Sequence, residues 1–161
     1  MYLIKKEEKF MNIEIENIPF SRIAYIRSIG PYGQRNVETM EALKKWAKSN
    51  GLFNDQSIIL GIALDNPEIV NPESCRYETC LVISSDYSIN EDYINDGSIL
   101  GGKYAVFKIK HTAEEVQKAW AEIFPNLLTE GYQFDDSRPI LERYVVAMIN
   151  NHYCEICVPI N

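Results

Sequence analysis

The stretch Glu78-Thr-Cys-Leu-Val-Ile83 returns near the end of the chain, after a four-residue shortening, as Glu155-Ile-Cys-Val-Pro-Ile160. Each copy closes the same series of predicted elements, which is a strand, an amphipathic helix and a further strand. Agreement in both the class and the order of the elements predicts that the chain is a duplicated βαββ unit.

The first unit begins where apolar and polar residues start to alternate, at Ile13. The alternation predicts β-structure as far as Tyr25, with a break near residues 17–19. A helix with Val37, Met40, Leu43, Trp46 and Ala47 on one face follows, and Asn50-Gly51 gives it a C-terminal stop. Two strands, over residues 57–64 and 77–83, complete the unit.

The second unit opens with a strand over residues 103–110, and Thr112 to Glu115 form a capping box for the next helix. We expect Pro125 to kink or end that helix near Phe124, because proline lacks the backbone N–H of a helix interior. Strands over residues 138–148 and 153–160 follow.

A shift of 81 positions superposes the two units without gaps and places Gly61 on Glu142. The predicted fold is therefore an α+β domain in which two halves, about residues 11–85 and 99–161, are related by a pseudo-two-fold axis. An N-terminal extension, residues 1–10, precedes them. We expect one antiparallel sheet with two helices on one side and a cleft along the axis, a favoured place for ligands.

Charge and hydropathy limit the partners. Of 161 residues, 46% are hydrophobic, and 16 basic against 23 acidic side chains give a net charge of −7. That sign argues against direct nucleic-acid binding, which uses a clustered basic surface, and favours cationic small molecules. No apolar run approaches the roughly 20 residues of a membrane span, and the N-terminus has no signal-peptide core, so we expect a cytoplasmic protein without a membrane partner.

Glu142 is the strongest candidate for a functional residue. Strand alternation places it on one face with Ile140, Tyr144 and Val146, so a carboxylate sits among apolar and aromatic neighbours. Its counterpart Gly61 has no side chain, an asymmetry that we interpret as room for a ligand. Alternatively, this face is solvated, or Glu142 pairs with a cross-strand Arg or Lys. We favour function, because a carboxylate partly desolvated by aromatic rings has a raised pKa and attracts organic cations.

Aromatic side chains are plentiful, and periodicity can direct five of them toward the cleft: Tyr25, Tyr77, Tyr104, Trp120 and Tyr144. Ordinary core or rim packing is the better interpretation of any one of them alone. As a group they predict an amphipathic lining with phenol donors, suited to planar ligands.

The cysteines and histidines give no chemical motif. Cys75 and Cys80 lie five residues apart and Cys154 and Cys157 three, so on a strand each pair points to opposite faces, and we expect reduced thiols and no metal. Neither histidine has a partner that suggests a catalytic triad, and we interpret His111 as a loop residue. Without a phosphate-binding glycine motif, no cofactor is expected.

Six segments in order resemble the GyrI-like small-molecule-binding domain, over residues 11 to 161. The segments are Ser21 to Tyr32, Leu64-Asp-Asn-Pro67, Cys75 to Cys80, Gly101 to Phe107, Arg138-Pro-Ile-Leu-Glu-Arg-Tyr144 and Glu155 to Ile160. The family includes effector-binding modules of AraC-type and multidrug-sensing transcription regulators. The resemblance implies a duplicated βαββ fold and an aromatic pocket on the pseudo-dyad, with Glu142 as the central acid beside Tyr144.

The chain also departs from that family. Only ten residues stand where its regulators carry a helix-turn-helix unit, so we expect no DNA recognition by this chain itself. Lys110-His-Thr112 replaces the usual glycine-containing loop before the second helix, which affects one wall of the pocket.

Three hypotheses follow. The leading one is a stand-alone, non-enzymatic domain that binds hydrophobic, often cationic or aromatic, small molecules around Glu142. The second is a hydrolase of strained or electrophilic cytotoxic compounds, in which Glu142 is the general base and a tyrosine or Trp120 orients the substrate. The third is a protein-interaction role with a partner such as gyrase or a separate regulator.

Overall fold

The computed structural model describes residues 12–161, so the extension predicted over residues 1–10 lies outside the described residues. In chain order the elements are β1 (Ile13–Ile18), β2 (Ser21–Ile29), α1 (Gln34–Ser49), β3 (Ile58–Ala63), the 3-10 turn η1 (Pro72–Ser74), β4 (Arg76–Ile83), β5 (Asn95–Ile99), β6 (Gly102–Lys110), α2 (Ala113–Thr129), β7 (Leu141–Val145), α3 (Val146–Asn150) and β8 (Tyr153–Pro159). No helix among these residues is long and apolar enough to cross a membrane.

The eight strands form one antiparallel sheet in the order β1-β6-β8-β7-β3-β4-β2-β5. The order is symmetric about its centre, where β3 of the first unit pairs with β7 of the second. The two edge strands are exchanged, because β1 precedes β2 in the chain but pairs with β6, while β5 precedes β6 but pairs with β2. This arrangement confirms the predicted duplicated α+β fold.

The pseudo-dyad passes between Gly61 and Glu142. These residues are 81 positions apart (142 − 61) and therefore equivalent in the two units, and they also face each other across β3 and β7. A residue that pairs with its own equivalent lies at a two-fold axis. The structure thus places the candidate carboxylate at the centre of the molecule.

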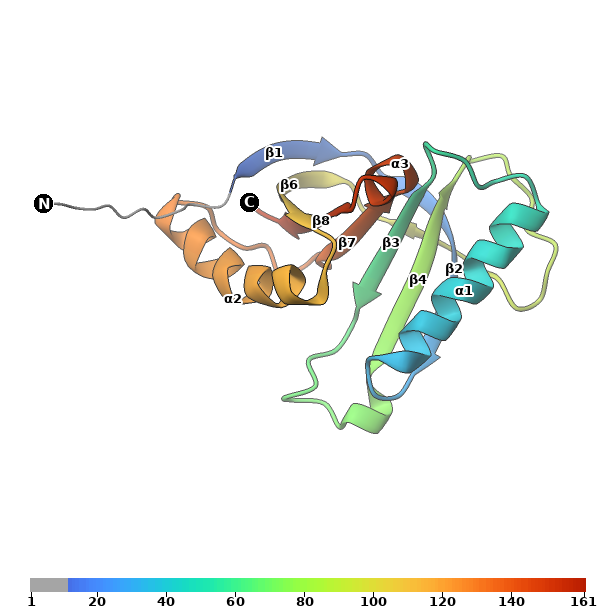
Figure 1. The fold of residues 1–161 in the computed structure, drawn as a ribbon, viewed down its shortest axis with the longest axis horizontal. Coiled ribbons are helices and arrows are strands. Elements are labelled where there is room, and N and C mark those ends of the chain that lie inside the picture. Colours follow the sequence, from blue (N-terminus) through green and yellow to red (C-terminus); the bar gives the residue numbers. More distant parts are fainter. Residues whose placement is uncertain (1–11) are drawn as a thin grey trace, which may run out of the picture.

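Both long helices lie on one side of the sheet, as predicted, with α1 over the first unit and α2 over the second (Figure 1). Under α1 the core contains Leu43, Trp46 and Leu81, and under α2 it contains Phe107, Ile123 and Ile156. A third cluster, including Leu60, Tyr104 and Leu141, packs on the opposite face of the sheet. Because strand side chains alternate, the six inner strands of the sheet each contribute to two of these cores or more.

Two predicted boundaries differ from the structure. Of the two outcomes expected at Pro125, a kink or an end, the end is wrong: helix α2 continues to Thr129, since Leu127 is buried in the core and the side-chain amide of Asn126 donates to the Glu122 carbonyl. The strand predicted over residues 138–148 stops at Val145. Val145 pairs with Ile58, the first residue of β3. Beyond it, the N–H groups of Val146 and Ala147 donate to the carbonyls of Ser57 and Asp55, and α3 starts.

Candidate ligand-binding site

Glu142 forms a hydrogen-bonded triad with two tyrosines on the helical face of the sheet. Its Oε1 atom accepts a hydrogen bond of 2.8 Å from the Tyr77 hydroxyl on β4 and one of 3.1 Å from the Tyr144 hydroxyl on β7. Among residues 12–161, Oε2 has no hydrogen-bond partner and no Lys or Arg forms an ion pair with Glu142. The cross-strand salt bridge considered as an alternative is thus absent from this part of the chain.

Gly61 provides space, but a protein side chain fills it. A Cβ atom built on Gly61 would lie 2.0 Å from the Tyr77 hydroxyl oxygen and 2.8 Å from Glu142 Oε1. The missing side chain therefore lets Tyr77 cross β3 and reach Glu142, while Gly61 itself still borders a cavity.

The environment keeps both tyrosines protonated and disfavours the carboxylate charge. Burial raises the pKa of the Glu142 carboxyl, and the hydrogen bonds from Tyr77 and Tyr144 lower it in part. Burial, and then the nearby Glu142 charge, raise the pKa of both tyrosine hydroxyls well above their usual range. The site therefore holds a carboxylate that gains electrostatically from a positive neighbour.

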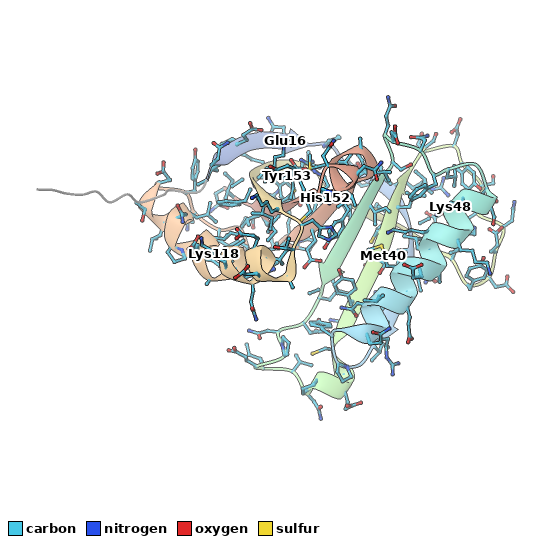
Figure 2. The ribbon with its side chains drawn as sticks, viewed as in Figure 1. Glu16, Met40, Lys48, Lys118, His152 and Tyr153 are labelled. Atoms are coloured by element: carbon cyan, nitrogen blue, oxygen red, sulfur yellow. The ribbon has the colours of Figure 1, made fainter. Side chains whose placement is uncertain are left out.

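A first cavity of about 600 Å³ lies on the α1 side of the triad. Its floor includes Ile59, Tyr77 and Tyr144, and α1 forms one wall with Val37 and Met40, the latter labelled in Figure 2. The side chains of Phe53, His111 and Ile149 contribute further lining. The cavity thus has an apolar floor with the triad tyrosines at its base, and Glu41, Lys44 and Asp55 add charged groups to its lining.

A second cavity of about 470 Å³ lies on the other side of the triad. Glu142 and Gly61 form its inner end, Trp120 of α2 and Ile140 form one wall, and Tyr32 with residues 63–67 forms the other. Tyr77 and Tyr144 line the first cavity while their acceptor Glu142 lines the second. The triad therefore stands where the two cavities meet.

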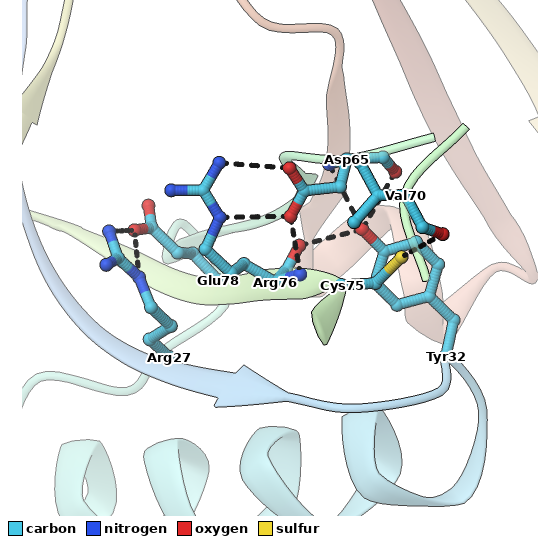
Figure 3. A network of polar contacts seen from close by, with 7 residues as sticks. All are labelled: Arg27, Tyr32, Asp65, Val70, Cys75, Arg76 and Glu78. Carbon is cyan, nitrogen blue, oxygen red and sulfur yellow. Dashed lines mark hydrogen bonds and ion pairs between the residues drawn. The ribbon is translucent and has the colours of Figure 1, made fainter. Parts of the chain in front are cut away.

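A polar network fastens the segment that walls the second cavity (Figure 3). The Arg76 guanidinium forms two hydrogen bonds to the Asp65 carboxylate, at 2.9 and 3.0 Å. The Tyr32 hydroxyl donates to the Asp65 and Arg76 carbonyls, at 2.9 and 2.8 Å. Its ring also packs edge-on against Tyr77, with centroids 5.8 Å apart. The network ties this wall to the start of β4 and to the triad.

The structure brings four of the six predicted site residues together: Glu142, Tyr77, Tyr144 and Trp120. Tyr25 and Tyr104 do not join them. Tyr104 is fully buried and Tyr25 is partly buried in the core on the opposite face of the sheet. Alternation showed which residues share a face of a strand, but not which face the helices cover.

Two features of the site were missed in the sequence. His111, interpreted as a loop residue, lines the first cavity with its ring 5.5 Å from that of Tyr144. Burial, and then the charge of Lys44, lower the pKa of His111. The Leu64-Asp-Asn-Pro67 turn, one of the segments that resemble the family, also lines the second cavity.

Cys154 and Cys157 lie on opposite faces of β8 as predicted, whereas Cys75 precedes β4 and is not on a strand with Cys80. Cys154 packs in the core under α2 and Cys157 in the core on the opposite face. Within residues 12–161 no group of three or more His, Cys, Asp or Glu side chains is arranged to hold a metal ion.

Comparisons with known proteins agree on one family. The model of the GyrI-like small molecule binding domain matches residues 11–161. The "SPbeta prophage-derived putative transcriptional regulator YosT" of Bacillus subtilis (strain 168) is 44% identical over 151 residues, which cover 93% of this chain and 99% of the relative. A DNA gyrase inhibitor of Citrobacter rodentium (strain ICC168) is 26% identical over 148 residues, covering 91% and 93%.

Solved structures share the fold at low sequence identity. The EcmrR C-terminal domain superposes with a TM-score of 0.73 at 15% identity, covering 95% of this chain and 99% of the other. SAV2435 bound to tetraphenylphosphonium gives a TM-score of 0.59 at 15% identity, covering 94% of each chain. The family match over residues 11–161 and the relative at 44% identity show that the chain belongs to the GyrI-like small-molecule-binding domains, which are related to the effector domains of transcription regulators.

Proposed function

We propose that the chain is a non-enzymatic binding domain for hydrophobic organic cations, which it holds at the pseudo-dyad against Glu142. One observation carries this proposal: the half-buried carboxylate is hydrogen-bonded by two neutral hydroxyls and has no cationic partner among residues 12–161. An unpaired carboxylate in an apolar site costs desolvation energy, and a bound cation offsets that cost.

The walls suit the apolar part of such a ligand. Trp120, Tyr32 and Tyr144 provide aromatic faces, which attract cations and pack against planar groups. The structural neighbour SAV2435, bound to a lipophilic phosphonium ion, supports the same ligand class for this chain. The overall charge of −7 attracts cations at longer range.

Two probes of almost equal shape and opposite charge test the proposal. Isothermal titration should show that tetraphenylphosphonium binds and that tetraphenylborate binds far more weakly. Glu142→Gln keeps the shape of the side chain and removes its charge, so it should weaken tetraphenylphosphonium binding by about 10- to 100-fold, the worth of a charge-assisted contact. Neutral triphenylphosphine oxide should bind wild type and variant about equally.

Glu38→Gln is the matched control, because Glu38 is an exposed acid on α1 that lines neither cavity. It should leave the affinity for the phosphonium ion within a factor of about two. Equal phosphonium affinity in wild type and Glu142→Gln would refute the proposal.

The triad also favours a second candidate function, hydrolysis of electrophilic compounds. A carboxylate with a raised pKa and a free Oε2 atom can accept a proton from water, and Trp120 faces the same cavity. In that case Glu142→Gln would retain binding of an electrophilic substrate but lose its turnover. Absence of turnover in the wild type would eliminate this candidate.

A protein partner is a third candidate, supported by the relative named DNA gyrase inhibitor. Purified gyrase passed over the immobilised chain tests it directly. Retention of gyrase at physiological ionic strength, roughly 0.15 M, would support a specific contact.

A further inference from the structure

Glu142 lies between two cavities and not at the closed end of one. Oε1 is bound by the two tyrosines that line the first cavity, while the residue itself lines the second cavity together with Gly61. The free Oε2 atom is therefore the one available to a cation at the junction. A positive group there has a cavity on either side.

Between the cavities stand the Tyr77 side chain, whose hydroxyl crosses β3 above Gly61, and Glu142. The backbone of β3 is the floor on both sides, since Ile59 lines the first cavity and Ala63 the second. The two cavities therefore follow β3 on either side of Glu142.

We infer that the preferred ligand is a two-armed organic cation, with its positive centre at Glu142 and one apolar arm in each cavity. The inference rests on the proposed function and specifies its ligand class. A cation with a single arm leaves one cavity hydrated. A second arm removes additional apolar surface from water without adding charge, and the binding energy of apolar contact grows with the area buried.

The two walls differ, so the arms are not equivalent. The first cavity combines aliphatic side chains such as Met40, Ile59 and Ile149 with polar and charged ones, among them Glu41, Lys44 and Asp55. The second is lined by Trp120 and Tyr32, with Pro67 at the turn. A flat aromatic arm therefore fits the second cavity best, while the first accepts arms of more varied shape.

Dibenzyldimethylammonium and benzyltrimethylammonium test this inference, because they share a quaternary nitrogen and differ in the number of aromatic arms. Val37→Phe fills the first cavity from an exposed position of α1, where Val37 is 53% exposed. Ala63→Phe fills the second from an exposed position of β3. The equivalent of Ala63 in the second unit is Tyr144, so this strand position accepts an aromatic residue.

We expect the two-armed ion to bind wild type at least tenfold more tightly than the one-armed ion. Each of the two substitutions should reduce that advantage to less than threefold, whereas the one-armed ion should respond to one substitution at most. Ile15→Phe is the matched control, since Ile15 on β1 is 43% exposed and lines neither cavity. It should change neither affinity, and thermal unfolding verifies that all variants fold.

Equal affinity of the two ions for wild type, or sensitivity of the two-armed ion to only one of the substitutions, would overturn the inference. Glu142→Gln separates this failure from that of the proposed function. Suppose that Glu142→Gln weakens the binding of both ions, while each cavity-filling substitution changes the affinities of the one-armed and two-armed ions equally. Cation binding then stands and the two-armed ligand is refuted. If Glu142→Gln weakens neither ion, the proposed function itself is refuted.

Discussion

The two halves of the sheet differ most at the axis that relates them. Gly61 of the first unit faces its equivalent Glu142 of the second, and one residue further along each chain Ile62 corresponds to Arg143. The second unit thus carries two adjacent charges where the first carries none. The two charges differ in their partners, and this difference distinguishes a structural charge from a candidate functional one.

Arg143 is fully paired on the face opposite the helices. Its guanidinium donates to Glu155 at 2.7 Å and to both carboxylate oxygens of Glu16, at 3.0 and 2.8 Å, which ties β7 to β8 and to the edge strand β1. Glu142, on the helical face, has two neutral donors and no cation within the described residues. Arg143 thus has anionic partners on its face of the sheet, whereas residues 12–161 provide no cationic partner for Glu142.

The largest effect is expected on removing the paired charge. Arg143→Met leaves the Glu155 carboxylate, whose side chain is 11% exposed, without its guanidinium partner. The free energy of unfolding in urea should fall by about 3–5 kcal/mol, the usual cost of breaking a buried pair from one side. Ile62→Met at the equivalent position of the first unit should cost less than about 1.5 kcal/mol. Equal losses at the two positions would contradict the comparison.

An intermediate effect is expected at the axis itself. Gly61→Ala places a Cβ atom on the Tyr77 hydroxyl, and relieving that overlap should cost about 1–3 kcal/mol of unfolding free energy, as overpacking generally does. In a Tyr77→Phe background the nearest oxygen is gone, so the same substitution should cost clearly less. A double-mutant cycle with no coupling between positions 61 and 77 would show that Tyr77 does not occupy this space.

A smaller effect is expected from the hydroxyl donors. Tyr77→Phe and Tyr144→Phe each remove a hydrogen bond that lowers the pKa of Glu142, so that pKa should rise further in both variants. The stability cost should be about 1 kcal/mol each. NMR titration of the Glu142 carboxyl carbon measures the shift, with Tyr25→Phe on the opposite face as the control. A pKa of Glu142 that falls or stays constant in both variants would contradict the triad.

Much of this arrangement is present in the sequence as a comparison of its two halves. The shift of 81 positions that pairs Gly61 with Glu142 also fixes the pseudo-dyad, because β3 and β7 are the central strands of a symmetric sheet. Helix α1 ends at the predicted Asn50-Gly51 signal, where Gly51 adopts a positive φ of 70°. Local signals of this kind depend on neighbouring residues and can be read directly.

Properties that depend on the packing of distant segments could not be predicted in this way. Tyr104 and Ala105 alternate in β6, yet only the docking of α2 decides that Ala105 faces the helix and Tyr104 the opposite core. His111 reaches the first cavity because of where the loop after β6 lies relative to α1. Pro125 is tolerated within α2 because tertiary burial of Leu127 outweighs a local preference.

The raised pKa of Glu142 also determines whether its contribution to stability increases or decreases with pH. The pKa of Glu142 is raised by burial, so the folded chain takes up a proton at a higher pH than the unfolded chain does. The contribution of Glu142 to stability is therefore fully present below its unfolded pKa and is lost as the pH rises through its folded pKa. In the ligand-free protein, Glu142→Gln should thus be as stable as wild type or more stable at neutral pH.

The affinity for tetraphenylphosphonium as a function of pH tests the central claim most directly. A bound cation favours the ionised carboxylate, so wild-type affinity should be constant above the raised pKa of Glu142 and should fall as the pH decreases through it. Below that pKa the affinity should fall about tenfold for each unit by which the pH decreases, as expected when a single group takes up a proton. The affinity of Glu142→Gln should be lower and independent of pH over the same range. Identical pH profiles for the two proteins would contradict the claim that the charge at the pseudo-dyad binds the cation.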